Sequence, residues 1–258
     1  MNSWEIATFH LGLGSFEMQA SFPVLASPLS PRYNPTLPMN ASPERTLETP
    51  AAGHDRVLLW LDRIDVYLLD QVMKRRLRPG MSLLDAGCGG GRNLGFFLRS
   101  GYEVFGVDEE ASAVAAVRAR AAELAPRLPA ENFRAEPVEA TSFADAAFDA
   151  VIANAVLHFA RDEAHFGAML DECRRVLRPG GLFFARLASS IGIEDRVRPI
   201  GGRRHRLPDG TERFLVDEAT LIAETERFGG RLVEPIKTVN VQGARCMTTW
   251  CLTKEAGA

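Results

Sequence analysis

The residues best suited to chemistry form a glycine-rich run that begins with an acid, Asp85-Ala86-Gly87-Cys88-Gly89-Gly90-Gly91-Arg92-Asn93. This run follows an expected strand at 82–85 and opens an expected helix at 92–100, which is the context of a nucleotide-binding turn. The dinucleotide pattern G-x-G-x-x-G fails in both frames, and no phosphate-loop pattern is present in the sequence. A carboxylate at Asp85 would repel a pyrophosphate, so the run favours a ligand that brings a positive charge.

A second acid, Asp108, ends the next apolar stretch, 23 positions after Asp85. A spacing of about twenty residues places a carboxylate on a ribose diol in nucleotide-binding units. S-adenosylmethionine joins such a ribose to an ammonium, a carboxylate and a sulfonium, and it has no phosphate. Asp85 can accept from the ammonium, while the helix N-terminus takes the carboxylate and Gly87 and Gly89 let the backbone approach the ligand. The run and the two acids therefore indicate this cofactor.

These residues need a sheet to position them, and the sequence alternates short apolar strands with helices. We expect five strands, at 82–85, 103–107, 133–136, 148–153 and 182–187, and four helices, at 92–100, 111–125, 163–177 and 217–228. Apolar residues recur at helical spacing from Leu58 to Val72, ahead of the first strand. Two consecutive strands, 232–239 and 246–253, close the chain as a hairpin. The pattern predicts an α/β fold with a doubly wound, mostly parallel sheet and one antiparallel strand.

The chain resembles the class I S-adenosylmethionine-dependent methyltransferases over about residues 55–255. Five segments carry the resemblance: Leu83 to Asn93, Val104 to Asp108, Phe148-Asp149-Ala150-Val151, Asn154-Ala155-Val156-Leu157-His158 and Leu177-Arg178-Pro179-Gly180-Gly181. It implies a seven-stranded Rossmann-like sheet whose last strand is antiparallel. It also implies methyltransferase activity, with S-adenosylmethionine at the carboxyl ends of the strands, between the first and the fourth.

The same resemblance implies roles for individual residues. Those expected to line the methionine half of the cofactor are Asp85, Gly87, Cys88 (through its backbone), Gly89 and Gly91. Asp108 would hold both ribose hydroxyls, with Glu109 beside the adenine edge. Asn154, at the end of the fourth strand, would face the methionine moiety and the transferred methyl group.

The loop after the third strand departs from the family pattern, because Pro137 stands where the family usually has an acid that contacts the adenine amino group. The backbone N–H of Val138 is still expected to reach the adenine ring. Whether Glu136 or Glu139 replaces the missing acid is left open by the sequence.

The acceptor is expected to be a small molecule. The fourth strand ends in Asn154-Ala155-Val156-Leu157, which lacks the Pro-Pro-aromatic sequence of nucleobase amino methylation and the Pro-Cys of cytosine methylation. Clustered Asp and Asn ligands for a metal are also lacking, so we expect no DNA substrate and no metal. His158 is a candidate general base or acceptor contact, and the alternative is a histidine packed at a strand-to-helix turn. Arg186 has the same alternatives.

A basic insertion follows the fifth strand, with six arginines and His205 between residues 196 and 213. Such arginines suit an anionic acceptor, and Arg204 and His205 join His158 as candidate catalytic residues. The alternative is a solvated basic loop. A basic segment at this place gives the chain a weaker similarity to the tellurite-type methyltransferases.

The whole chain has 258 residues, a formal charge of -3 and 46% hydrophobic residues, which is typical of a globular protein. Seven of its fifteen prolines fall in the first fifty residues, so we expect a disordered tail at 1–53 before a methyltransferase domain at 54–258. Translation from Met39 rather than Met1 is a second interpretation of this tail. Four cysteines without motif spacing and no apolar run of membrane length predict a cytoplasmic protein with no membrane partner.

Three alternatives to a small-molecule methyltransferase remain at this point. The arginine-rich insertion could serve RNA methylation, although a mildly acidic chain disfavours RNA as a partner. A cofactor-binding module without turnover would carry the same motifs. An NAD-dependent dehydrogenase would require the third glycine of the dinucleotide pattern, which this run does not place correctly.

Overall fold

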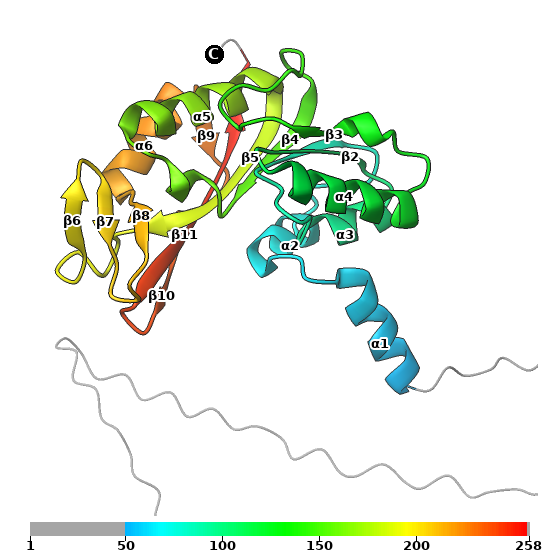
Figure 1. Cartoon of the computed structure of the whole chain (residues 1–258), viewed down its shortest axis with the longest axis horizontal. Coiled ribbons are helices and arrows are strands. Elements are labelled where there is room, and N and C mark those ends of the chain that lie inside the picture. Colours follow the sequence, from blue (N-terminus) through cyan, green and yellow to red (C-terminus); the bar gives the residue numbers. More distant parts are fainter. Residues whose placement is uncertain (1–49, 257–258) are drawn as a thin grey trace, which may run out of the picture. The chain divides into compact units, whose positions relative to one another are not determined.

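A computed structural model describes residues 50–256, which form a mostly parallel sheet with helices on both faces (Figure 1). The strands follow the order β10-β11-β5-β4-β1-β2-β3. Their bounds are β1 Ser82–Ala86, β2 Glu103–Asp108, β3 Phe133–Ala135, β4 Phe148–Asn154, β5 Leu177–Ser189, β10 Lys237–Val241 and β11 Arg245–Lys254. The first connections run from β1 outward to β3, and the chain then returns to β4 on the other side of β1. The direction of winding therefore changes between β1 and β4, which is where open α/β sheets bind ligands.

The closing hairpin supplies the antiparallel strand. β11 runs antiparallel to β5 on one side and to β10 on the other. The expected strand at 232–239 is two separate strands in the structure. β9 (Gly230–Leu232) pairs with the C-terminal end of β11, and β10 pairs with its N-terminal half. The predicted seven-stranded, doubly wound sheet is confirmed, with β9 as a short additional strand.

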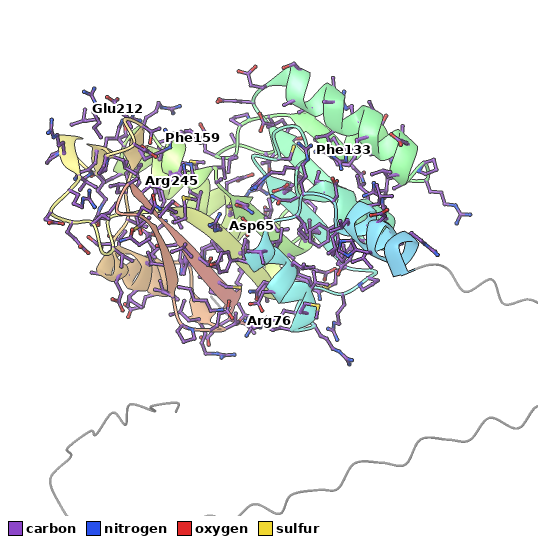
Figure 2. All side chains as sticks on the ribbon, turned by 90° about the horizontal axis from the view of Figure 1, so that it is seen from below. Asp65, Arg76, Phe133, Phe159, Glu212 and Arg245 are labelled. Carbon is purple, nitrogen blue, oxygen red and sulfur yellow. The ribbon has the colours of Figure 1, made fainter. Side chains whose placement is uncertain are left out.

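The expected N-terminal helix is two helices in the structure, α1 (Pro50–Leu61) and α2 (Val66–Met73). The first helix ends before Asp62, whose φ is +57°. The second begins after Asp65, whose side chain accepts a hydrogen bond from the N–H of Tyr67. An aspartate at this position satisfies a free N–H of the first turn. Figure 2 labels Asp65 at the start of α2 and Arg76 beyond its end.

The first helix also begins earlier than the domain boundary that we predicted at His54, because α1 starts at Pro50. The rest of the predicted tail, residues 1–49, lies outside the described residues, as do residues 257 and 258.

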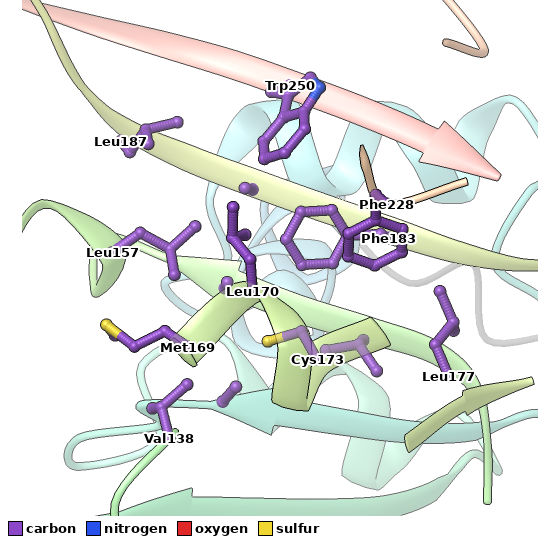
Figure 3. Packing of buried hydrophobic residues seen from close by; sticks show 14 of the residues in the cluster. Val138, Leu157, Met169, Leu170, Cys173, Leu177, Phe183, Leu187, Phe228 and Trp250 are labelled. Carbon is purple, nitrogen blue, oxygen red and sulfur yellow. The ribbon is translucent and has the colours of Figure 1, made fainter. Parts of the chain in front are cut away.

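Adjacent residues of each central strand enter two different hydrophobic layers. Leu84, Val151 and Phe183 pack in the layer that includes residues of α5 (Glu163–Val176) and α6 (Glu218–Arg227). The opposite layer holds Leu83 and Phe184 together with residues of α2, α3 (Leu94–Arg99) and α4 (Ala111–Leu124). Figure 3 shows side chains of α5, β5 and β11 meeting in the first layer. Burial on both faces explains why these strands read as continuous apolar runs.

Two segments differ from the sequence-based expectation. Residues 178–181, between the helix expected at 163–177 and the strand expected at 182–187, form a bulge inside β5. Leu177 already pairs with Phe148, and the regular register resumes at Leu182. The basic insertion folds into a small antiparallel sheet of β6 (Arg198–Gly201), β7 (Arg204–Arg206) and β8 (Glu212–Phe214). Strands of three or four residues are too short to be recognised in a sequence rich in arginine, glycine and proline.

Candidate functional site

The glycine-rich run crosses the point where the winding of the sheet changes. Gly87 has a φ of +74°, and a Cβ at this position would lie 2.7 Å from the Cβ of Val156, on the segment after β4. Only glycine permits both the backbone conformation and this close approach. Gly89 also has a positive φ, of +49°, and its N–H donates to Asp108 Oδ2 over 2.8 Å. The run is thereby folded over the ends of β1, β2 and β4.

Asp108 joins the run to the end of β2. Its second carboxylate oxygen, Oδ1, accepts from the N–H of Glu110 over 3.0 Å. Each oxygen retains a second lone pair for a ligand. Cys88 has a structural place in the same run, because its N–H donates to the carbonyl of Val107 and its own carbonyl accepts from Gly91. Its thiol packs beside Gly106 in the hydrophobic layer.

A cavity of about 600 Å³ opens beside the run. Five of the residues predicted to bind the cofactor line it, namely Gly87, Gly89, Asp108, Glu109 and Val138. Glu139, one of the two acids between which the sequence left the choice open, also lines the cavity. Further lining residues that the sequence did not indicate include Phe159, Arg161, His165 and Met169. The other four predicted residues, Asp85, Cys88, Gly91 and Asn154, are buried at the ends of β1 and β4 or within the run and do not form its walls.

Asp85 is a buried carboxylate, with 2% of its surface exposed. Burial raises the pKa of Asp85 to about 7; the nearby charge of Arg92 lowers it and that of Asp108 raises it. A carboxylate in this state gains strongly from a cationic partner, because the partner compensates the cost of burying its charge.

Asn154 ends β4 with its carboxamide buried, and neither the amide oxygen nor the amide nitrogen finds a partner within residues 50–256. Buried amides in proteins are almost always satisfied, so an unpaired one at the end of a strand is a candidate ligand contact. Ala155 follows with a φ of +64°, a strained conformation for a residue with a Cβ. Such strain is concentrated at functional sites.

The loop after β3 resolves which acid faces the cavity. Glu136 accepts hydrogen bonds from the N–H and hydroxyl of Ser142, and it does not line this cavity. Glu139 lines the cavity, with its Oε1 3.0 Å from Nε2 of His165. Burial raises the pKa of Glu139, but its hydrogen bonds and the charges of His165 and Arg161 outweigh this, so the pKa is lowered. No sequence motif indicated His165, because it reaches the cavity from α5.

A second cavity, of about 420 Å³, meets the first at Ala155, which lines both. Four arginines from four different elements contribute to its walls: Arg92, Arg186, Arg213 and Arg245. Only Arg213 belongs to the basic insertion. Figure 2 labels Arg245, which lines this cavity, and Phe159 near it. The guanidinium of Arg213 lies 4.9 Å from the centre of the Phe159 ring.

Arg186 anchors this cavity to α2. Its Nη1 donates to Asp65 over 3.1 Å, and its guanidinium lies 5.1 Å from the ring centre of Tyr67. The Nε of Arg186 is buried and has no partner in the described part of the chain. The arginine therefore keeps its Nε–H for a ligand while its position is fixed.

His158 lines the second cavity, but the structure does not bring the other two catalytic candidates there. Arg204 donates to the carbonyl of Ala160 and lies near Glu212, and His205 contacts the carbonyl of Arg203. Both lie on β7 of the small sheet, and neither lines either cavity.

Among residues 50–256, no cluster of three His, Cys, Asp or Glu side chains is placed to hold a metal ion. Within the same range, no helix combines the length and the apolar character needed to cross a bilayer.

Comparison with known proteins identifies the class. A model described as "Methyltransferase domain" matches residues 84–185, from β1 into β5. A ubiquinone biosynthesis O-methyltransferase of Methylobacterium nodulans is 30% identical over 221 residues, covering 80% of this chain and 84% of that protein. A probable S-adenosylmethionine-dependent methyltransferase of Mycolicibacterium smegmatis is 31% identical over 58% of this chain; the chain spans about half its length, 52%.

The chain belongs to the class I S-adenosylmethionine-dependent methyltransferase family, and S-adenosylmethionine is its cofactor. Among solved structures, the 1,6-didemethyltoxoflavin-N1-methyltransferase of Burkholderia thailandensis, with bound 1,6-didemethyltoxoflavin and S-adenosylhomocysteine, has a TM-score of 0.57. It is 22% identical, over 80% of this chain and 85% of that chain, so it shares the fold. The dehydrogenase alternative is thereby set aside.

Proposed function

We propose that this protein transfers the methyl group of S-adenosylmethionine to a small anionic molecule. The observation that carries the proposal is the meeting of two cavities at Ala155, one beside the glycine-rich run and the other lined by four arginines. Methyl transfer from a sulfonium is an in-line displacement that depends mainly on positioning. Two adjoining cavities supply that arrangement, with the cofactor in the first and the acceptor in the second.

In the first cavity, Asp108 receives the ribose hydroxyls, and the charge of Asp85, buried at the end of β1, attracts the cofactor's ammonium. Three observations support this assignment. Asp85 is buried with a raised pKa, so a cation beside it is favourable. Asp108 is fixed by two backbone N–H groups and still faces the cavity. The unsatisfied carboxamide of Asn154 lies at the end of β4, where the methionine moiety would meet it.

At the other end of this cavity, Glu109 lies beside the adenine and Val138 offers it a backbone N–H. Glu139 accepts from the adenine amino group and so replaces the acid that Pro137 displaces. Its place on the cavity wall supports this, whereas Glu136 is engaged with Ser142. The pairing of Glu139 with His165 fixes the carboxylate in position.

An anionic acceptor is supported by the charge of the second cavity. Its four arginines face a single acid among the lining residues, Asp209. Guanidinium groups bind carboxylates and phosphates through paired hydrogen bonds. The names of one relative, a ubiquinone biosynthesis O-methyltransferase, and of the structural neighbour, a 1,6-didemethyltoxoflavin-N1-methyltransferase, support a small molecule rather than a macromolecule.

Two measurements test the proposal in sequence. Calorimetry with S-adenosylmethionine and S-adenosylhomocysteine should show binding of both to the purified full chain. Release of S-adenosylhomocysteine is then followed across a panel of small acids and their uncharged amides. Turnover with acids supports the proposal, and turnover confined to the amides or to RNA contradicts it. Cofactor binding without any turnover would instead favour a module that binds but does not catalyse.

A further inference from the structure

His158 is the only ring nitrogen base among the residues that line the second cavity. Its Nδ1 accepts a hydrogen bond from the backbone N–H of Ala188, 3.2 Å away on β5. A backbone N–H can only donate, so the lone pair of Nδ1 is occupied. In the neutral ring the proton must then be on Nε2.

This tautomer decides what His158 can do for a ligand. Nε2 makes no hydrogen bond within the described chain, so it is the ring nitrogen left for a bound molecule. In this form Nε2 donates a hydrogen bond and has no lone pair with which to take a proton. Protonation would require Nδ1 to give up Ala188.

The surroundings oppose protonation as well. Burial, together with the charges of Arg213 and Arg186, lowers the pKa of His158 to about 4. Arg92 and Arg245 line the same cavity, and Asp209 is the only acid among its walls. The neighbouring ring is that of Phe159, which supplies no charge.

Asp209 does not take the place of a base. Its Oδ1 accepts from the N–H and the hydroxyl of Thr211, and its Oδ2 lies 3.8 Å from Arg245. Burial raises the pKa of Asp209, but these hydrogen bonds and the charges of Arg245 and Arg213 outweigh it and lower the pKa. Its carboxylate is therefore a weak base that is already engaged.

We propose, resting on the proposed function, that the acceptor reacts as a carboxylate that is ionised before it binds, with His158 as a fixed Nε2–H donor that positions it. An alcohol, phenol or amine would need a base to take its proton, and the walls of this cavity supply none. A carboxylate needs no base, and four arginines and a neutral donor suit it.

The step balances without a proton. A carboxylate oxygen donates an electron pair to the methyl carbon, a C–O bond forms, and the C–S bond breaks with its pair going to sulfur. The products are a methyl ester and the neutral thioether S-adenosylhomocysteine. By contrast, methylation of a phenol or an amine releases one proton for each turnover.

The first test is nitrogen NMR of the full-length protein bound to S-adenosylhomocysteine, with His158→Gln used to assign the signal. We expect the Nε2–H tautomer and no titration between about pH 5.5 and 8.5. An Nδ1–H tautomer, or a titration near pH 6 to 7, would overturn the proposal. Binding of S-adenosylhomocysteine to the same sample is measured separately, so a failure of the proposed function is recognised as such.

A second test uses benzoate and benzamide as matched probes of the second cavity. Benzoate should shift the His158 Nε2–H signal and benzamide should bind at least tenfold more weakly, whereas equal binding contradicts the proposal. For any acceptor that turns over, proton uptake or release is followed with an indicator in weak buffer. We expect no proton per S-adenosylhomocysteine formed, and one proton each would refute a carboxylate. His158→Gln should raise the KM of the acceptor about fivefold and leave the pH profile of kcat unchanged.

Discussion

The two cavities that meet at Ala155 are built in different ways. Part of the wall beside the glycine-rich run lies at the carboxyl ends of adjacent strands, where Gly87, Gly89 and Asp108 fall within short motifs. The arginines of the second cavity come from the loop before α3 and from β5, β8 and β11, far apart in the sequence. The first cavity is fixed by the sheet itself, whereas the second depends on side chains that can change without altering the fold.

This difference explains how one fold keeps a cofactor while accepting many substrates. It also predicts that variants of the first cavity affect folding and cofactor binding together. Variants of the second cavity should affect only the acceptor. The following predictions test that separation, in order of decreasing expected effect.

Gly87→Ala should be the most damaging single change. It places a Cβ against Val156 and requires a positive φ of a residue that disfavours it, which together cost about 2 to 5 kcal/mol of folding free energy. Thermal or urea unfolding of the cofactor-free protein measures this. Gly89→Ala is the control, because a Cβ there meets nothing within 4 Å, so its loss should be clearly smaller. Equal losses for the two variants would mean that the close approach to Val156 is not what constrains the run.

Asp85→Asn should weaken S-adenosylmethionine binding by about 1 to 3 kcal/mol, because it removes a charge-assisted contact with the ammonium. In the protein with Asp85, affinity should rise as the pH increases through about 7, where the carboxylate ionises. The variant should lose this dependence, which calorimetry at several pH values can measure.

The same substitution should stabilise the cofactor-free protein at pH 8. A pKa raised in the folded state means that the native protein holds a proton that the unfolded chain releases. Stability therefore falls as the pH rises from about 4 towards about 7, and the asparagine removes this loss. A variant that is less stable than the parent at pH 8 would show that Asp85 has a structural partner instead.

The contrast between the cavities also sets what the sequence could predict. The sheet, its antiparallel strand and the five motif residues on the first cavity wall follow from local patterns, since each motif sits at the end of one strand. His158 and Arg186, two candidate acceptor contacts, do line the second cavity. Its full set of arginines could not be predicted, because nothing local relates Arg92 to Arg245. The basic insertion drew attention to Arg204 and His205, yet both lie on the small sheet outside the cavities.

The position of His165 was hidden for the same reason. It lies on α5, and only the packing of that helix brings its ring to the loop after β3. The break between α1 and α2 was also missed, because the apolar spacing continues through Asp62 and gives no sign of the turn.

Arg245→Ala should raise the KM of the acceptor by about 5- to 20-fold, since it removes one charge-assisted contact worth about 1 to 2 kcal/mol. Cofactor affinity should stay unchanged, which calorimetry checks on the same sample. Arg206→Ala is the matched control, because Arg206 pairs with Glu212 on the small sheet and lines neither cavity. A loss of cofactor affinity in Arg245→Ala would contradict the independence of the two cavities.

Glu139→Ala should have the smallest effect and the most specific one. Loss of a single hydrogen bond to the adenine amino group costs about 1 kcal/mol, or about fivefold in affinity for S-adenosylhomocysteine. The hypoxanthine analogue, which has an oxygen in place of that amino group, should bind Glu139→Ala and the parent protein with more nearly equal affinity. The preference for adenine should therefore shrink in the variant.

Glu136→Ala distinguishes this explanation from a general loss of negative charge in the loop. Glu136 belongs to the same loop and carries the same charge, but its carboxylate is bound to Ser142 and does not line the cavity. Its removal should leave the preference for adenine intact. If both variants lose the preference equally, the loop acts through its net charge. The recognition of adenine would then not depend on the single carboxylate that His165 holds at the wall of the cavity.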